Sequence, residues 1–355
     1  MRFSLIMKAW CEEKGAETMN EGRLILPHDY ENKLDYVSTE IAIKYVKDLF
    51  ERRLAYHLNL MRVSAPLFVR KDSGLNDNLN GVERPVTFDI RDIEGDVEIV
   101  HSLAKWKRMA LKRYGFEVNK GIYTDMNAIR RDEIVDNLHS VYVDQWDWEK
   151  IISAENRTLD HLQETVKKIM KALKETEQQL CKVFENLEPF IKEEITFITS
   201  QELEDRYPHL TPKEREYEFT KLHGSACIMQ IGDKLNSGIP HDGRAPDYDD
   251  WALNGDILIY YPVIDQAVEI SSMGIRVDSM SLLSQLEKSG CMDRIALPFH
   301  KALLAGELPL TMGGGIGQSR ICLLLLNKAH IGEVQAGAWP TPMIEKCRAH
   351  NIILL

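Results

Sequence analysis

A glycine-rich stretch near the end of the chain is the first candidate for binding a ligand. It runs Leu308-Pro-Leu-Thr-Met-Gly-Gly-Gly-Ile-Gly-Gln-Ser-Arg320 and has four glycines within residues 313–317. Without side chains, such a backbone can come close to a ligand or to a neighbouring strand. Arg320 then opens an apolar run that predicts a buried helix, so its guanidinium could meet phosphate oxygens or stack on a base. The spacing matches neither a dinucleotide fingerprint nor a phosphate loop, and a structural turn explains the glycines about equally well.

A second stretch, residues 100–108, combines a hydroxyl with several cations. A predicted strand runs here into a predicted helix, which places Ser102, Lys105 and Lys107 near a helix N-terminus. The N-terminus of a helix favours anions because its first backbone N–H groups are unpaired. The alternative is that the lysines form a solvated basic face of the helix, and the pattern alone leaves both interpretations open.

Two further stretches place polar groups beside aromatic ones. In residues 138–148, period-two alternation sends Gln145 and Asp147 to one face of a predicted strand and two tryptophans to the other. In residues 241–251, four carboxylates crowd around Arg244 and two aromatic side chains. A polar loop could have this composition for solubility alone. Burial beside aromatic rings, however, would be costly for these carboxylates without ligands.

The composition limits the class of protein. With 355 residues, 44% hydrophobic and 28% charged, the chain can bury a sizeable core. The formal net charge of −11 disfavours nucleic acid as a partner and leaves a small anionic substrate possible. The six cysteines are scattered without a CxxC pair, which argues against a zinc or disulfide scaffold and favours a reducing compartment. No apolar run approaches the roughly 20 residues that span a bilayer, so we expect a cytoplasmic protein without membrane contact.

The elements that must position these groups begin with a helix. We expect it to start at Ser38, as N-cap, with Ile41, Tyr45, Leu49 and Leu54 on its inner face. The helix leads to a strand at residues 61–70 that Pro66 interrupts. Proline has no N–H to donate to a neighbouring strand, so this strand should lie at a sheet edge or at an interface.

Further strands are predicted from runs rich in β-branched and aromatic residues that end at turn residues. They occupy residues 85–89, 97–101, 138–148, 195–199, 225–231, 256–263 and 267–277. A long amphipathic helix is predicted between Asn156 and Leu187, with apolar residues at spacings of three and four. This mixture indicates an α+β domain with a largely antiparallel β-sheet flanked by helices. We divide the chain into an N-terminal extension at 1–34 and one domain at 35–355.

Longer strings in the chain resemble one enzyme family. The strings are DNLNG (77–81), HSLAKWKR (101–108), HSVYVDQWDWE (139–149), RAPDYDDW (244–251), LNGDIL (253–258), EISSMGIRVD (269–278) and GGGIGQSR (313–320). Together they look like the ammonia-dependent asparagine synthetases, the AsnA type of aspartate–ammonia ligase, whose catalytic domain is class II aminoacyl-tRNA synthetase-like. The glycine-rich stretch then resembles motif 3, and the helix with its Pro66 strand resembles motif 1, which implies a homodimer. One departure is a connection at residues 251–255 that is shorter than in bacterial members.

The resemblance implies a set of nucleotide-binding residues. Arg130 would contact the α-phosphate of ATP as the motif 2 arginine. Arg320 would pack against adenine and the γ-phosphate, with Gly315 beside the nucleotide. Asp256 and Glu269, on adjacent strands, would face the nucleotide and hold Mg²⁺, because this ion prefers hard oxygen ligands.

The resemblance also implies a site for L-aspartate. Asp77 would pair with the α-amino group of the substrate, and Arg276 with its α-carboxylate. The pocket would be completed by Ser102, Lys107, Gln145, Asp147, Asp249 and Ser272.

In the implied reaction, the β-carboxylate of aspartate attacks the α-phosphorus of ATP. This step yields an aspartyl-adenylate and pyrophosphate, and ammonia then displaces AMP to form L-asparagine. Arg130, Lys107 and Mg²⁺ would stabilise the charge of the transition state, Gln145 would complete the catalytic set, and Asp249 is the candidate for receiving ammonium. Free ammonium is the expected donor, because Arg2 stands where an N-terminal-nucleophile glutaminase needs a cysteine.

Two alternatives stay open. An aspartyl- or asparaginyl-tRNA synthetase forms the same adenylate on the same fold, but it carries a strand-rich domain of about a hundred residues before motif 1. Only about sixty residues precede Pro66 here, and they look helical. A catalytically silent regulatory paralogue on this scaffold is the second alternative, against which the intact charged set argues.

Overall fold

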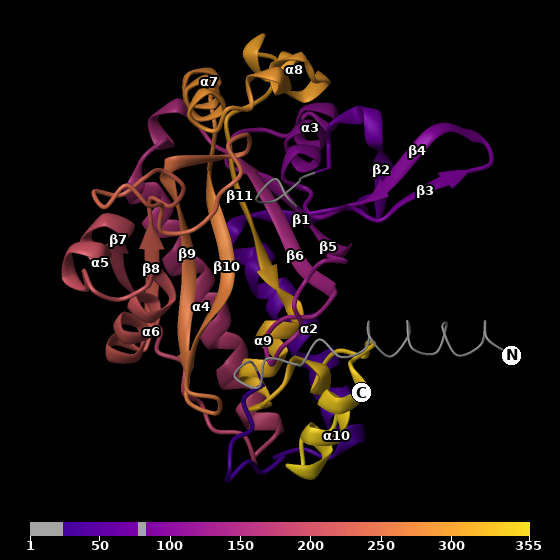
Figure 1. Cartoon of the computed structure of the whole chain (residues 1–355), viewed down its shortest axis with the longest axis vertical. Helices are drawn as coiled ribbons and strands as arrows, with labels where there is room; N and C mark the ends of the chain where they lie inside the picture. The colour runs from indigo at the N-terminus through magenta and orange to yellow at the C-terminus, as the bar shows by residue number, and fades with distance from the viewer. Residues whose placement is uncertain (1–23, 77–82) are drawn as a thin grey trace, which may run out of the picture.

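One large sheet organises the fold. The computed structural model describes residues 24–76 and 83–355, so Asp77 lies outside the described residues. Eight strands pair in the order β1-β5-β6-β11-β10-β9-β8-β7, parallel in the two outer pairs and antiparallel in between (Figure 1). The expected α+β fold with a largely antiparallel sheet is confirmed. The strands are β1 (Leu60–Arg62), β5 (Gly121–Ile129), β6 (Tyr142–Ile151), β7 (Thr196–Thr199), β8 (Ser225–Met229), β9 (Asp249–Tyr261), β10 (Gln266–Arg276) and β11 (Thr311–Gly317).

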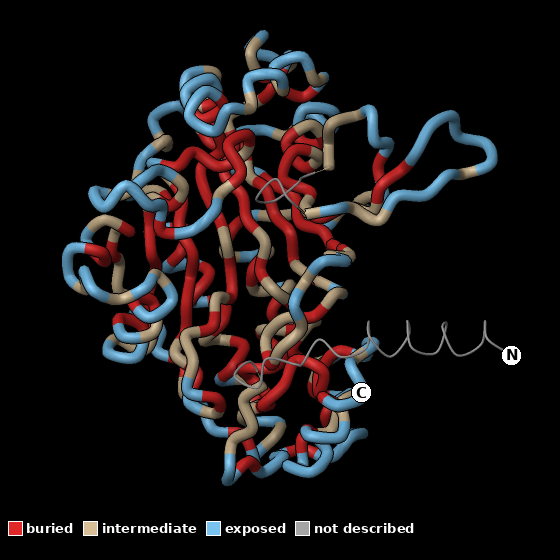
Figure 2. The backbone as a smooth tube through the Cα atoms, viewed as in Figure 1, coloured by how far each residue is buried: buried red, intermediate tan, exposed pale blue. Residues whose placement is uncertain are grey.

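Helices cover the two faces of this sheet differently. On one face lie α2 (Tyr36–Leu58), α4 (Leu159–Val183) and α9 (Gln318–Leu325), which share a continuous apolar core with the strands. The other face carries α3 (Ala104–Tyr114) at the β5–β6 side and α5 (Ser200–Arg206) with α6 (Pro212–His223) at the β8 side. Figure 2 shows the burial concentrated in the central strands. The remaining helices are α7 (Ser279–Lys288), α8 (Pro298–Leu304) and α10 (Thr341–Ala349).

Alternation along β6 separates the two faces as predicted. Trp146 and Trp148 are fully buried in the core with α2 and α4, whereas Gln145 and Asp147 face the opposite side. The long helix α4 is also confirmed, with its three- and four-residue spacing buried at Leu162, Val166, Ile169 and Leu173. One face of the sheet is therefore left free of core helices over its middle.

Helix α2 exists as predicted, with Leu54 buried and Tyr45 packed against the core, but its start and the inward placement of Ile41 were predicted wrongly. Asp35, not Ser38, is the N-cap, because its carboxylate accepts the backbone N–H of Ser38 and starts the helix earlier. The buried face includes Ala42, Val46, Phe50 and Leu54, a ladder of side chains that recur every four residues. Ile41 is 59% exposed, since this ladder rather than Ile41 points at α4 and the sheet.

The strand that Pro66 interrupts is split between two sheets. Its first part is β1, at the edge of the large sheet, and its second part is β2 (Phe68–Arg70). With β4 (Ile93–Ile99) and β3 (Thr87–Ile90), β2 forms a small sheet that projects from the body (Figure 1). The predicted connection at residues 251–255 is wrong, because these residues lie inside the long strand β9.

The predicted boundary between an extension and the domain falls partly outside the described residues. Residues 24–34 are described, and they pack on the main core through Leu24, Leu26, Tyr30 and Leu34. The division at residue 35 stays a prediction. No helix in the described ranges combines the length and the apolarity needed to cross a membrane.

The buried ladder of α2 makes a test of the fold. Phe50 is fully buried and its ring lies 4.7 Å from that of Trp146. We expect Phe50→Ala to lower the free energy of unfolding by about 3–5 kcal/mol, because it leaves a cavity against the sheet. Leu222→Ala, at a side chain that is 61% exposed on α6, should change it by less than about 0.5 kcal/mol. Urea denaturation measures both, and a loss for Phe50→Ala no larger than that for Leu222→Ala would show that Phe50 does not face the sheet.

Candidate active site over the glycine strand

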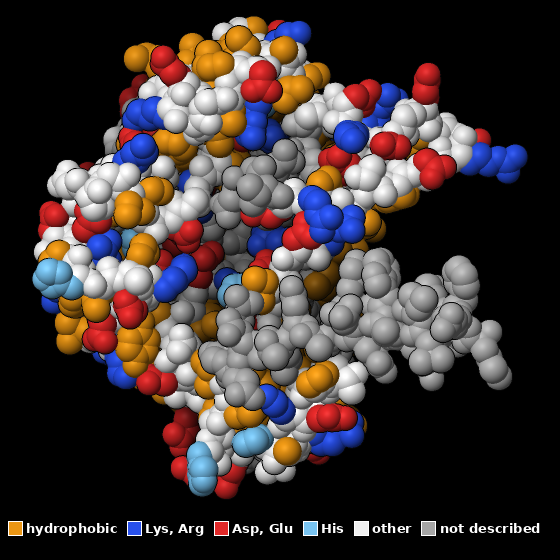
Figure 3. All heavy atoms as spheres, viewed as in Figure 1, with side chains coloured by type: hydrophobic (Ala, Val, Ile, Leu, Met, Phe, Trp, Pro, Cys, Tyr) orange, Lys and Arg blue, Asp and Glu red, His pale blue; other side chains and the backbone are white. Residues whose placement is uncertain are grey.

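A cavity of about 480 Å³ opens over the middle of the large sheet, on the face away from α2 and α4. This volume is typical of a small-molecule site. Strands β6, β11, β10 and β9 contribute its floor, and the start of α3, the segment after β5 and residues 242–249 contribute its walls. Figure 3 shows acidic and basic side chains gathered in the middle of this face.

The glycines of β11 make room for side chains from the neighbouring strands. A Cβ built on Gly313 would lie 2.0 Å from Glu149 Oε2 and 2.5 Å from Arg276 Nη2. A Cβ on Gly315 would lie 2.2 Å from Gln145 Oε1. The glycines lie in a strand, so the alternative of a structural turn is wrong. We call residues 313–317, with the side chains that cross them, the glycine trough.

A buried ion pair lies at one end of the glycine trough. Arg276 Nε donates to Glu149 Oε1 at 3.0 Å and Nη2 donates to Oε2 at 2.7 Å, while Nη1 donates to Asp249 Oδ1 at 2.5 Å. Burial alone would raise the pKa of Glu149, but Arg276 and Lys107 outweigh it and hold that pKa below its ordinary value. Glu149 is therefore held as a carboxylate against Arg276, which also donates to Asp249.

Lys105 and Lys107 of α3 are buried and paired, so the alternative of a solvated basic face is wrong for them. Lys107 donates to Asp147 and to the carbonyl oxygen of Trp148, the latter at 2.8 Å. Lys105 lies 3.4 Å from Asp247. Lys107 does not line the cavity. Asp147 lies between Lys107 and the cavity and is itself a lining residue.

A second charged group lies on the other side of β11. Arg244 Nη2 donates to Asp256 Oδ1 at 2.7 Å, and Nη1 donates to Ser272 Oγ. Asp256 and Ser272 are direct partners in the pairing of β9 with β10. Burial, together with repulsion from Glu269, raises the pKa of Asp256 to about 6, against the opposing attraction of Arg244.

Irregular strand pairing brings some of these groups to one face. Glu269 and Ser272 are three residues apart on β10, so strict alternation would put them on opposite faces. The register of the pairing with β9 shifts between Glu269 and Ser271, and this shift changes which side chains of β10 face the cavity. Glu269 and Ser272 therefore both line it. A second shift, between Gly274 and Arg276, brings Asp249 into the same cavity as Asp256.

The predicted crowd of four carboxylates around Arg244 does not form. Asp242 pairs with Lys213 and Asp250 with Arg157. Asp247, fully buried, is held by Lys105, Arg294 and His300, and Asp249 shares Arg276 with Glu149. Only Asp249 approaches Arg244, at 3.9 Å, so the segment distributes its charges among several elements.

The nucleotide-side residues lie at the other end of the glycine trough. Arg320 is in the first turn of α9, and its Nη1 donates to the carbonyl oxygen of Glu269 at 2.8 Å. Arg130 follows β5, and its buried Nε has no hydrogen-bond partner among the described residues. The cavity is lined by eleven of the thirteen predicted site residues: Ser102, Arg130, Gln145, Asp147, Asp249, Asp256, Glu269, Ser272, Arg276, Gly315 and Arg320. The other two are Lys107, which lies behind Asp147, and Asp77, which lies outside the described residues.

Sequence reasoning missed several residues of the site. Glu149 continues the alternation of Gln145 and Asp147, so the period-two pattern could have found it. Arg244 was noticed in its stretch but was not assigned to the cavity. Lys213 on α6 and Gln335 also line the cavity, and no local pattern in the sequence marks either of them.

Two carboxylates fit a divalent cation that is shared with a ligand. Within the described part of the chain, no group of three or more His, Cys, Asp or Glu side chains is arranged to hold a metal ion. However, the repulsion between Asp256 and Glu269 would be relieved by a cation between them. Glu269 also has no ion pair with any described residue. An ion here would need further oxygen ligands from a substrate or from water.

Comparison with known proteins gives a consistent result. The family model described as "Aspartate-ammonia ligase" matches residues 37–351. The chain is 64% identical over 333 residues to an aspartate–ammonia ligase of Ruminiclostridium cellulolyticum, covering 94% of this chain and 99% of that protein. It is 60% identical over 334 residues to an aspartate–ammonia ligase of Clostridium perfringens, with 94% and 99% covered.

Among solved structures the fold is similar to that of a class II aminoacyl-tRNA synthetase. An asparaginyl-tRNA synthetase of Entamoeba histolytica, in complex with asparaginyl-adenylate, matches with a TM-score of 0.56 at 12% identity. The match covers 84% of this chain and 66% of that one, so the chain spans about two thirds of the synthetase. At this identity the likeness concerns the fold alone.

The glycine trough makes a test of the site. We expect Gly313→Ala to destabilise the protein by about 1–3 kcal/mol, because the new methyl group would displace Glu149 or Arg276 from their ion pair. Gly337→Ala is the matched control, since its Cβ would meet nothing closer than 3.6 Å. Urea denaturation of both variants measures the difference. Wild-type stability in Gly313→Ala would mean that the ion pair does not lie across β11.

Proposed function

The chain belongs to the aspartate–ammonia ligase family, and from this premise we propose that it makes L-asparagine from L-aspartate, ATP and free ammonia. ATP would be cleaved to AMP and pyrophosphate through a β-aspartyl-adenylate. The observation that carries the proposal is the glycine trough, where the residues expected to bind ATP and those expected to bind aspartate line one cavity. A reaction between two bound substrates needs both of them to be held next to each other in one cavity.

The two substrates would lie end to end along the trough. The nucleotide end is formed by Arg320, Glu269 and Arg130, and the aspartate end by Ser102 and Arg276. Arg130 supports this arrangement, since its buried Nε lacks a described partner and a phosphate oxygen would satisfy it. Asp77, for the α-amino group, remains a proposal from the sequence alone.

The first step would be attack by the β-carboxylate oxygen of aspartate on the α-phosphorus of ATP. The bond from the α-phosphorus to the bridging oxygen breaks, and pyrophosphate leaves with the electron pair. Arg130 would stabilise the charge that develops on the α-phosphate. Lys107 would act from behind, because it neutralises Asp147 and so limits the repulsion between that carboxylate and the substrates. Gln145 would orient the aspartate from across Gly315.

The second step would be attack by ammonia on the acyl carbon of the adenylate, with AMP leaving. Ammonium must first lose a proton to become a nucleophile. Asp249 is the proposed acceptor: one oxygen is held by Arg276, and the other lies 3.9 Å from Arg244 Nε, beside the aspartate end. A carboxylate there would also attract the ammonium cation.

Magnesium is part of the proposal. Glu269 and Asp256 would hold it together with phosphate oxygens of ATP, which suits its preference for oxygen ligands. When bound, the ion would supply positive charge against the phosphate chain.

Two other functions deserve a test. A synthetase that charges tRNA would have the same fold, but the identity to aspartate–ammonia ligases and the net charge of −11 disfavour it. A silent regulatory paralogue is disfavoured by the complete set of charged groups around the cavity. We also propose that the protein acts in the cytoplasm without nucleic acid or membrane partners.

The function is tested by product analysis. With aspartate, ATP, Mg²⁺ and ammonium, we expect asparagine, AMP and pyrophosphate in equal amounts, because the carboxylate is activated at the α-phosphorus. Without ammonium, aspartate-dependent exchange of pyrophosphate into ATP should persist. The addition of tRNA should change neither rate. Formation of ADP and phosphate instead would contradict the adenylate, and no reaction at all would favour the regulatory paralogue.

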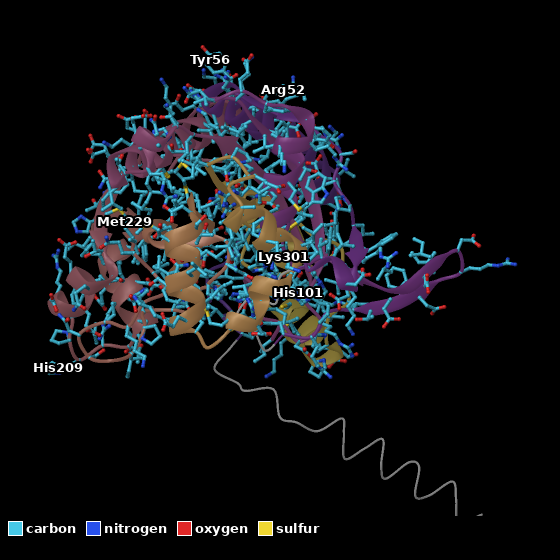
Figure 4. The ribbon with its side chains drawn as sticks, turned by 90° about the horizontal axis from the view of Figure 1, so that it is seen from above. Arg52, Tyr56, His101, His209, Met229 and Lys301 are labelled. Atoms are coloured by element: carbon cyan, nitrogen blue, oxygen red, sulfur yellow. The ribbon has the colours of Figure 1, made fainter. Side chains whose placement is uncertain are left out.

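We further propose a homodimer with an isologous interface that includes α2. Its outer face exposes apolar side chains, with Val37 70%, Ile41 59% and Tyr56 79% exposed, and such a patch supports an interface. Figure 4 shows Tyr56 and Arg52 pointing outward at the rim of the molecule.

The dimer is tested by light scattering at micromolar concentration. We expect twice the mass of the chain for the wild type and a monomer for Tyr56→Glu, because a charge would be buried in the interface. Tyr114→Glu is the matched control, since Tyr114 is 44% exposed on α3 and should leave the mass unchanged. A monomeric wild type, or a dimeric Tyr56→Glu, would exclude this interface.

A further inference from the structure

Arg244 is a cavity residue to which the proposed mechanism gives no role. Its side chain is only 7% exposed, and it reaches across the paired strands β9 and β10. One nitrogen binds Asp256, on the proposed nucleotide side, and the other binds Ser272, on the proposed aspartate side. Arg244 therefore stands where the two proposed subsites meet.

The third nitrogen of Arg244, Nε, has an unsatisfied N–H group. Nε is buried and, in the ranges 24–76 and 83–355, has no hydrogen-bond partner. Its nearest acidic neighbour is Asp249 Oδ2 at 3.9 Å, which is beyond hydrogen-bond distance. A buried N–H donor without an acceptor is costly and is expected to find one when a ligand binds.

Arg130 shows the same feature on the opposite side of the trough. It follows β5, whereas Arg244 spans β9 and β10, and β11 lies between them in the sheet. Both side chains line the cavity, and both carry a buried Nε without a described partner. Each of these donors would be satisfied by an anionic group bound over the glycine trough.

We propose that Arg244 contacts the α-phosphate of the nucleotide from the side opposite Arg130. This inference rests on the proposed function for the identity of the anion. As the carboxylate oxygen bonds to phosphorus and the bond to the pyrophosphate oxygen breaks, charge on the non-bridging oxygens is stabilised from both sides. No proton moves to or from Arg244, because a guanidinium stays charged.

Asp256 and Ser272 hold the guanidinium in place before the nucleotide arrives. A long arginine side chain that is already bonded at two nitrogens loses little further freedom on binding phosphate. The same contacts create a competing explanation, since Arg244 could help an anion to bind merely by neutralising Asp256. The experiment has to separate direct contact from neutralisation.

Equilibrium binding of AMP and of adenosine, measured by calorimetry without magnesium, makes this separation. The two ligands differ only in the α-phosphate. We expect Arg244→Gln to weaken AMP about 10- to 100-fold, the range for a lost charge-assisted hydrogen bond, and to leave adenosine within about threefold. Arg157→Gln is the matched control: Arg157 is half-buried between Asp250 and Asp278 outside the cavity, so AMP and adenosine should bind as in the wild type.

The double variant Arg244→Gln/Asp256→Asn decides between contact and neutralisation. If Arg244 contacts the phosphate, the double variant stays as weak for AMP as Arg244→Gln. Recovery of wild-type AMP affinity would show that Arg244 only neutralises Asp256 and would overturn the proposal. Equal weakening of AMP and adenosine by Arg244→Gln would show a structural role and would overturn it as well.

Two further outcomes separate this inference from the proposed function. A wild-type protein that binds AMP no better than adenosine overturns the phosphate site itself, whatever reaction the protein catalyses. The expected AMP pattern in a protein that forms no asparagine supports the site and refutes only the ligase reaction.

If Arg244→Gln fails to fold, Arg244→Lys replaces it. Lysine keeps the charge but lacks the fork, so AMP should weaken about fivefold or more, and unchanged AMP affinity would overturn the contact.

Discussion

The site depends on one buried ion pair, between Arg276 and Glu149. Charges taken out of water are tolerated only when they are paired and hydrogen-bonded, and both partners here are almost completely buried. The pair lies across β11, where any side chain at position 313 would collide with it. The need to bury this pair explains the glycine at position 313 of β11, and the side chain of Gln145 explains Gly315 in the same way. The same absence of side chains leaves the floor of the cavity open.

The charges around the cavity form one connected series of alternating sign. Lys107 bridges Asp147 and Glu149, Arg276 bridges Glu149 and Asp249, and Arg244 lies between Asp249 and Asp256. Such pairing holds the side chains in one geometry, which a reaction between two bound substrates requires. The Nε atoms of Arg130 and Arg244 have no hydrogen-bond partner among the described residues, and the carboxylate of Glu269 has no ion pair with them. These are the groups through which a ligand would be recognised.

The comparisons and the geometry support each other at different levels. Identity of 64% to an aspartate–ammonia ligase assigns the family, and the likeness to a tRNA synthetase at 12% identity concerns only the fold. The geometry adds what neither contains, namely which side chains share the cavity. It also separates residues of one short stretch: within 241–251, Arg244 and Asp249 line the cavity, whereas Asp247 and Asp250 pair away from it.

The sequence by itself determined the α+β class, most strands, the inward tryptophans of β6 and eleven of the residues that line the cavity, because these follow from local periodicity and from long characteristic strings. It did not determine the buried face of α2, where the four-residue ladder through Phe50 rather than Ile41 meets the sheet. Only the tertiary structure decided that Glu269 and Ser272 share a face, since this requires an irregular pairing of two strands. It likewise decided which cation each carboxylate binds, because those partners lie far apart in the chain and meet only when the sheet has formed.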